Sequence, residues 1–122
     1  METKDDDIKK LLFDIHNLGP KIIAITDGKE GAYLYHENKF WFMPIYPDPK
    51  PPINRTGAGD AFSSTFVVAI LLGKNPEEAL RWGPINSMSV TQQIGARAGL
   101  LSREKLEEFL KNAPEDYKPR PI

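Results

Sequence analysis

The residues best suited to chemistry lie in the segment Asn54–Phe62, whose sequence is NRTGAGDAF. Gly57 and Gly59 allow the backbone to approach a ligand closely, and the apolar run that follows them indicates a helix. The first turn of a helix carries unpaired N–H groups and partial positive charge, which favour a phosphate group. Asp60 falls in that first turn, where a carboxylate can accept a proton beside a bound anion. The segment therefore predicts an anion site with an adjacent base.

A simpler interpretation explains the same residues from their spacing alone. Glycines at a helix start allow close packing between elements, and an aspartate in the first turn stabilises the helix dipole. The segment is not a Walker-type phosphate loop, because the pattern G-x-x-x-x-G-K-[ST] occurs nowhere in the chain. Proton transfer by Asp60 and simple helix stabilisation both remain open at this point.

Composition excludes several other functions. The chain has 122 residues, enough for a single domain over residues 1–122, and its net charge of −1 offers no basic surface to nucleic acid. It has no cysteine for disulfides or thiolate chemistry, and His16 and His36 lack metal-ligand spacing. Its apolar runs are too short to cross a bilayer, and its acidic N-terminus does not resemble a signal peptide. We therefore expect a cytoplasmic protein without nucleic-acid or membrane partners.

Hydrophobic periodicity predicts the elements that precede the glycine-rich segment. An amphipathic helix comes first and ends at Gly19-Pro20, and three strands follow it. The first of these strands is short and apolar, which is typical of a buried strand, and the other two are expected to form a hairpin through Glu37–Lys39. The predicted bounds are Lys4–Leu18 for the helix and Lys21–Thr26, Ala32–His36 and Phe40–Ile45 for the strands.

Three helices are predicted after the glycine-rich segment. The first begins at Gly57 or Ala58, ends near Leu72 and is apolar nearly all round, so we expect it to be central and buried. The second begins after the cap residue Asn75 and ends near Gln93, with Gly83-Pro84 expected to kink or interrupt it. The third, Arg103–Asn112, begins after Ser102, and the proline-rich residues 114–122 are expected to form a loose tail. This order indicates a layered α/β fold.

Several segments together carry a resemblance to a known family. Thr56–Phe62 (TGAGDAF) resembles the C-terminal signature of the ribokinase-like (PfkB) carbohydrate kinases. Ile25–Tyr35 (ITDGKEGAYLY) resembles the T-x-G-x-x-G turn and hairpin of that family, and Leu71–Gly83 and Gln92–Leu100 fit in the same order. The resemblance covers nearly all of the chain from Lys21 onward. It implies the C-terminal portion of a ribokinase-like α/β/α sandwich, with about three strands and four helices.

The resemblance implies a role for each matching residue. Asp60 matches the general base that takes the proton from the sugar hydroxyl as it attacks the γ-phosphate. The backbone of Gly57, Ala58 and Gly59 matches the anion hole that stabilises the transferring phosphoryl group. The implied cofactors are ATP and Mg²⁺, and the implied acceptor is a sugar or nucleoside. The implied nucleotide-binding positions are Thr26, Gly28, Gly31, Ile53, Gly57 and Gly59.

The chain departs from the family pattern at three positions. The family usually has aspartate where this chain has Asn54, and a small hydroxyl residue where it has Arg55. Asn54 offers an oxygen ligand but no charge, which weakens the K⁺ site that the resemblance implies at Asn54 and Thr56. Pro84 lies near the position where the family contacts the adenine ring, and it lacks an N–H group.

Family members are much longer than this chain, and their N-terminal part supplies the sugar pocket and an N-x-x-E motif that organises Mg²⁺. Asn75-x-x-Glu78 and Asn112-x-x-Glu115 match that motif in letters only, because both follow the GAGD helix instead of preceding it. We therefore expect the C-terminal, ATP-binding half of a carbohydrate kinase. The alternatives are a non-catalytic nucleotide-binding module and a self-associating remnant. An exposed edge at the strand Lys21–Thr26 predicts a homodimer.

Overall fold

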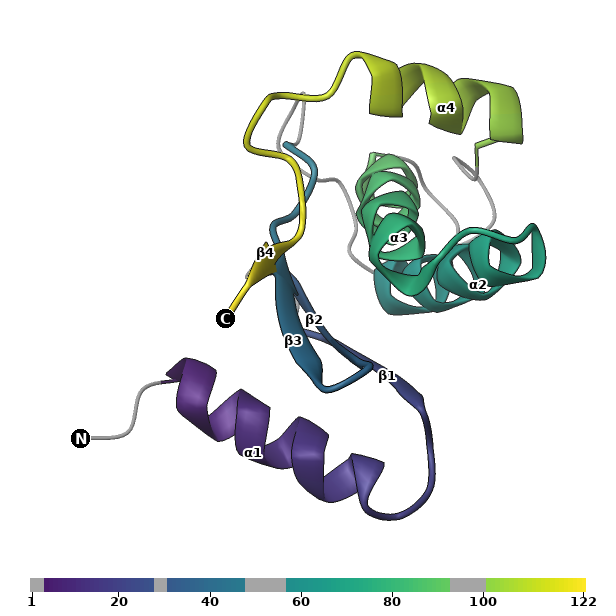
Figure 1. Cartoon of the computed structure of the whole chain (residues 1–122). Coiled ribbons are helices and arrows are strands. Elements are labelled where there is room, and N and C mark those ends of the chain that lie inside the picture. The colour runs from purple at the N-terminus through teal and green to yellow at the C-terminus, as the bar shows by residue number, and fades with distance from the viewer. Residues whose placement is uncertain (1–3, 28–30, 48–56, 93–100) are drawn as a thin grey trace.

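A computed structural model describes residues 4–27, 31–47, 57–92 and 101–122. Its elements follow the predicted order and add a short strand at the C-terminal end (Figure 1). They are α1 (Lys4–His16), β1 (Ile22–Thr26), β2 (Ala32–His36), β3 (Lys39–Met43), α2 (Ala58–Leu71), α3 (Pro76–Thr91), α4 (Arg103–Lys111) and β4 (Arg120–Pro121). In the described residues no helix is long and apolar enough to cross a membrane.

The strands form one antiparallel sheet in the order β1-β2-β3-β4. The hairpin between β2 and β3 is confirmed, with a two-residue turn at Glu37 and Asn38. Both turn residues have positive φ, 51° and 65°, which is the conformation that matches the twist of two antiparallel strands. Because β1 is an outer strand, it is less buried than predicted: Ile23 is buried, whereas Ile22 is 38% exposed.

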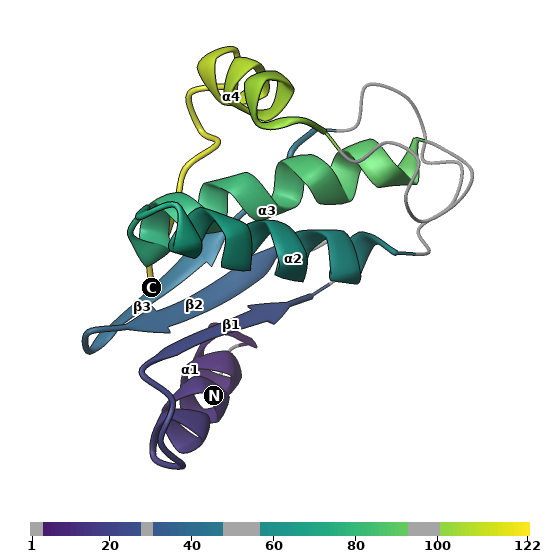
Figure 2. The same cartoon turned by 90° about the vertical axis from the view of Figure 1, so that its right-hand side faces the viewer.

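Helices cover both faces of the sheet, which gives the layered arrangement predicted from the sequence (Figures 1 and 2). On one face, Leu12 of α1 is fully buried among side chains of β1 and β2. On the other face, α3 packs against β2 and β3, and α2 packs against α3. The larger core lies between these helices and the sheet, with Leu34 and Met43 from the strands and Leu80 and Ile85 from α3. This core positions the N-terminal end of α2 above the end of β1.

Helix α2 begins and ends where predicted, but it is not buried on all sides. Its core face consists of Ala61, Phe62, Thr65, Phe66 and Ala69. Its opposite face exposes a stripe of apolar side chains, of which Leu71 is 79% exposed. The prediction of a central, buried helix is therefore wrong for this chain, because no described element covers that stripe. The other members of the stripe are Val67, Val68 and Leu72.

Helix α3 continues through Gly83-Pro84 without the predicted interruption. Gly83 lies directly against α2: a Cβ atom at this position would be 2.5 Å from the ring of Phe62. The missing side chain of Gly83 thus allows the two helices to approach closely.

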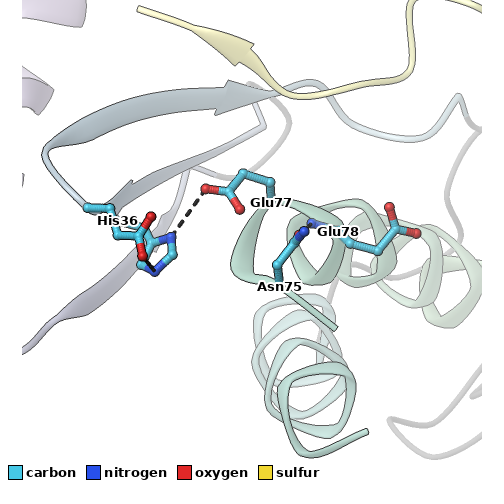
Figure 3. A network of polar contacts seen from close by, with 5 residues as sticks. His36, Asn75, Glu77 and Glu78 are labelled. Carbon is cyan, nitrogen blue, oxygen red and sulfur yellow. Dashed lines mark hydrogen bonds and ion pairs between the residues drawn. The ribbon is translucent and has the colours of Figure 1, made fainter. Parts of the chain in front are cut away.

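The N-terminus of α3 is fixed by polar contacts to its own cap and to the sheet (Figure 3). Asn75 accepts a hydrogen bond of 2.8 Å from the backbone N–H of Glu78, as expected for a cap residue. In Figure 3 the carboxylate of Glu77 points toward His36 of β2, at 3.2 Å from its Nδ1 atom. The oxygen of Asn75 is therefore used by the helix cap, which agrees with its rejection as a metal ligand.

Residues 114–122 pack against the fold and do not form the loose tail that their composition suggests. Tyr117 is only 2% exposed, and its hydroxyl donates a hydrogen bond to the backbone oxygen of Arg81 in α3. Beyond it, β4 pairs with β3, and the N–H of Ile122 donates to the oxygen of Phe40 at 3.0 Å. A single aromatic anchor and a short strand thus hold this segment in place.

We predict that Gly83→Ala lowers the free energy of unfolding by about 1 kcal/mol. The added methyl group would overlap with the Cδ2, Cε2 and Cγ atoms of the buried Phe62 ring. Overpacking of this kind costs about 1–3 kcal/mol, which is more than the gain in helix propensity. Urea denaturation measures the change. Combining Gly83→Ala with Phe62→Leu should recover part of the loss, and a fully additive double variant would contradict the contact.

We predict that Tyr117→Phe lowers the free energy of unfolding at neutral pH by about 1 kcal/mol, because it removes one buried hydrogen bond. Burial raises the pKa of Tyr117 well above its ordinary value of 10.0, partly opposed by the Arg81 charge. The folded chain therefore keeps this proton at pH values where the unfolded chain loses it. The resulting stabilisation is complete below pH about 10 and is lost as pH rises from there through the folded-state pKa.

Stability measured as a function of pH should accordingly fall less steeply above pH about 10 for Tyr117→Phe than for the unmodified chain. Parallel curves for the two proteins would contradict the assignment of this titration to Tyr117.

Candidate functional site

A cavity of about 220 Å³ lies where the N-terminal end of α2, one face of α3, the turn between β1 and β2, and the residues after β3 meet. It is smaller than the roughly 300–1,000 Å³ of a typical ligand pocket, and its size suits one part of a nucleotide better than a whole one. Its lining residues are Thr26, Gly31, Ala32, Ile45, Tyr46, Ala58, Gly59, Phe62, Pro84, Ser87, Met88 and Thr91.

The start of α2 forms one wall of the cavity. Gly57 caps the helix in the left-handed conformation, with φ of 87°, which favours glycine. The first intrahelical bond is donated by the N–H of Ala61 to the oxygen of Gly57 at 2.9 Å. The N–H groups of Ala58, Gly59 and Asp60 precede that bond and have no acceptor within the helix. Since Ala58 and Gly59 also line the cavity, this end of α2 can bind an anion there.

A side chain of α3 holds this first turn in place. The hydroxyl of Ser87 donates a hydrogen bond of 2.7 Å to the backbone oxygen of Ala58. Ser87 was not predicted from the sequence as a site residue. Helical spacing could have identified it, because Pro84, Ser87, Met88 and Thr91 recur at i, i+3, i+4 and i+7 and all line the cavity.

The turn between β1 and β2 brings two predicted residues to the opposite wall. Thr26 ends β1, and the N–H of Asp27 donates to the oxygen of Gly31 at 2.8 Å. Gly31 has φ of 125°, and a Cβ atom there would lie 2.3 Å from the backbone oxygen of Met43. Local packing therefore requires glycine at position 31, whatever the cavity binds.

Aromatic and aliphatic side chains close the deeper part of the cavity. Tyr46, from the segment after β3, packs edge-on against Phe109 and Tyr117 and lines the cavity together with Phe62 and Met88. The hydroxyl of Tyr46 donates a hydrogen bond to the oxygen of Phe109 at 3.3 Å, and burial raises the pKa of Tyr46 above its ordinary value. This apolar region suits a flat ring, and the first turn of α2 suits an anionic group.

The structure brings together four of the predicted site residues: Thr26, Gly31, Ala58 and Gly59 line one cavity. Gly57 and Asp60 adjoin Ala58 and Gly59 in the chain but do not line the cavity. The side chain of Asp60 is exposed in the first turn of α2. The predictions at Gly28, Ile53, Asn54 and Thr56 lie outside the described residues. Among the described residues, no group of three or more His, Cys, Asp or Glu side chains is arranged to hold a metal ion.

Comparison with known proteins identifies the family to which the chain is similar. Residues 2–103 match the family model of the pfkB family carbohydrate kinases. The chain is 36% identical over 93 residues to a ribokinase of Bacillus subtilis, an alignment that covers 76% of this chain and 31% of that protein. It is 31% identical over 96 residues to a cytidine kinase of Thermococcus kodakarensis, covering 78% and 34% of the two chains.

A solved structure agrees with these sequence matches. The ribokinase of Arabidopsis thaliana, complexed with ribose and ATP, superposes with a TM-score of 0.79 at 31% identity, covering 90% of this chain and 35% of that one. This match confirms the predicted ribokinase-like α/β fold. The chain spans about a third of the length of the curated relatives it matches.

The variant Gly59→Ala separates a packing role of the glycine-rich turn from a ligand role. Gly59 is helical, and a Cβ atom there would have no neighbour within 4 Å, so we predict a gain in stability of up to about 1 kcal/mol from helix propensity. The same methyl group would stand in the cavity wall, and we predict that ADP binding weakens about tenfold or more. Thermal denaturation and calorimetric titration measure the two effects, and a destabilised variant with unchanged ADP binding would contradict the ligand role.

Proposed function

Because the chain belongs to the pfkB family of carbohydrate kinases, we propose that it forms the ATP-binding and catalytic part of a phosphotransferase whose acceptor is the hydroxyl group of a sugar or nucleoside. The observation that carries this proposal is that the residues around the end of β1 and the start of α2 line the same cavity. Two segments that the sequence associates with phosphate binding, one ending β1 and the other starting α2, are far apart in the chain and meet at its walls. The relatives named above are kinases of ribose and cytidine, which supports this class of acceptor.

The cavity residues fit a nucleotide in two parts. The apolar side chains of Tyr46, Phe62 and Met88 would hold the base, with Pro84 in the same wall. The N–H groups at the start of α2 would bind the phosphates, because a helix N-terminus offers both donors and partial positive charge. ATP supplies the phosphoryl group when bound. Ser87 keeps the Ala58 peptide in position, so these donors need not reorganise as negative charge develops.

Asp60 would act as the general base. It is exposed in the first turn of α2, next to the N–H groups assigned to the phosphates, where an acceptor hydroxyl can approach from solvent. Its carboxylate would take the hydroxyl proton as the oxygen attacks phosphorus, and this requires only hydrogen-bond reach. Phosphoryl transfer depends mainly on positioning and charge stabilisation, which are the properties this turn provides.

In the proposed function, Mg²⁺ binds together with the nucleotide. Mg²⁺ would arrive bound to the ATP phosphates, as is usual for enzymes that use nucleotides, because the described residues offer no ready-made cluster for it. The K⁺ site at Asn54 and Thr56 stays a prediction from the resemblance.

A second function is favoured by the length comparison. The chain matches only about a third of each curated relative, so about two thirds of the length of those proteins lies outside the match. A module that binds nucleotide without turnover is therefore the alternative. An assay of ADP release with ribose and cytidine as acceptors distinguishes the two, because the alternative predicts nucleotide binding in calorimetry and no ADP release.

We predict that Asp60→Asn lowers the rate of ADP release by about 10²–10⁴-fold, because it removes the base and keeps the shape of the side chain. ATP affinity measured by calorimetry should change little. Asp14→Asn is the matched control, since Asp14 is an exposed carboxylate on α1 away from the cavity. Equal rates for Asp60→Asn and the unmodified chain would contradict the assignment of the base.

A further inference from the structure

Tyr46 lines the cavity from a segment whose backbone is not part of the sheet. Residues 44–47 follow the end of β3 and belong to no helix or strand. Pro44 and Pro47 have no N–H group, so the segment has fewer donors with which to fix its own backbone. The position of the Tyr46 ring therefore depends mainly on the contacts of its side chain.

Two aromatic side chains from the C-terminal part of the chain supply these contacts. Phe109 of α4 meets the Tyr46 ring edge-on, with ring centroids 5.6 Å apart and ring planes at 90°. Tyr117 meets the same ring at 5.0 Å and 77°. The hydroxyl of Tyr46 also donates to the backbone oxygen of Phe109, which gives the contact a direction. Figure 1 shows the same arrangement in the backbone, because the segment after β3 runs beside the yellow C-terminal segment.

Both supporting rings are anchored to the helices on the cavity side of the sheet. Tyr117 is buried, its hydroxyl bonds to the backbone oxygen of Arg81 in α3, and the Arg81 guanidinium carbon lies 5.8 Å from its ring centroid. Helix α4, which carries Phe109, begins at the cap residue Ser102 and buries Leu106 in the same core as Tyr117. Since α3 also lines the cavity, these anchors fix the two rings relative to the cavity wall.

We propose that Phe109 and Tyr117 are positioning residues for the base of the nucleotide, and that they act through Tyr46. This inference rests on the proposed function, in which Tyr46 belongs to the apolar wall that holds the base. Neither residue lines the cavity, and neither lies within residues 2–103, which match the family model. Their role is inferred from the contacts within the folded chain alone.

Holding Tyr46 in place before the nucleotide arrives strengthens binding. A side chain that is already ordered loses little conformational freedom on binding, and edge-on aromatic pairs are favourable enough to keep it ordered. Without one supporting ring, Tyr46 gains rotamers that do not face the base, so only a fraction of the molecules is ready to bind. The start of α2 is held separately, by the bond from Ser87 to Ala58, so its geometry at the phosphates stays the same.

Titration with ADP, followed through the amide NMR signals of Ala58 and Gly59, tests this inference. Phe109→Leu and Tyr117→Leu should each weaken ADP binding about three- to tenfold, and the amide shifts at saturation should equal those of the unmodified chain. Tyr117→Phe keeps the ring, so its ADP affinity should lie within about twofold of the unmodified value. A merely structural role for these rings would not separate the affinity from the saturated shifts in this way.

Phe40→Leu is the matched control. Phe40 is also a half-buried phenylalanine that meets a tyrosine edge-on, at 5.0 Å from the ring of Tyr35, but it lies in the core on the α1 side of the sheet. Its replacement removes the same kind of contact away from the cavity. We therefore expect the ADP affinity of Phe40→Leu to equal that of the unmodified chain.

Three results would overturn the inference alone: unchanged ADP affinity in both Phe109→Leu and Tyr117→Leu, an equal loss in Phe40→Leu, or altered saturated shifts at Gly59. If Tyr117→Leu fails to fold, Phe109→Leu decides, because its substitution is at a half-buried position. An unmodified chain that binds no ADP would overturn the proposed function, and this inference with it.

Discussion

The close contact between α2 and α3 is the constraint on which the rest of the site depends. Gly83 has no side chain, so the ring of Phe62 can lie against the backbone of α3. At that spacing Ser87 reaches the oxygen of Ala58, and the first turn of α2 is fixed at the cavity wall. A larger residue at position 83 would separate the helices, and both the hydrogen bond and the shape of the cavity would change with them. The chemistry proposed for this turn therefore depends on the packing of Phe62 against Gly83.

Local signals in the sequence predicted the elements well. The cap residues Asn75 and Ser102 and the glycines at the ends of α2 specify backbone conformations within a few residues, so the helix ends follow from them. Features that depend on distant contacts were missed or wrong. Tyr117 anchors residues 114–122 through α3, and no local pattern reveals that partner. The same contrast between local signals and distant contacts holds for the candidate site. The glycine-rich turn was identified from its motif, whereas Ser87, which lies on the facing helix, was not.

The exposed apolar stripe on α2 shows how far a helix can be interpreted from its own residues. An all-round apolar sequence predicts burial, yet burial requires neighbours, and the described part of this chain covers one side only. The solved ribokinase that superposes on it contains about two and a half times as much chain, since the match covers 90% of this chain and 35% of that protein. The apolar composition of α2 thus indicates that other protein surface can pack on all of its sides. The structure shows which face of α2 remains available for a partner or for further chain.

The proposed function requires that the cavity between α2, α3 and the turn after β1 binds a nucleotide. Amide chemical-shift mapping by NMR during titration with ADP and Mg²⁺ tests it most directly, because every backbone N–H reports separately. We predict saturable shifts concentrated at Thr26, Gly31, Ala58 and Gly59, with little change on α1. Saturable shifts elsewhere, or none at millimolar ADP, would contradict it.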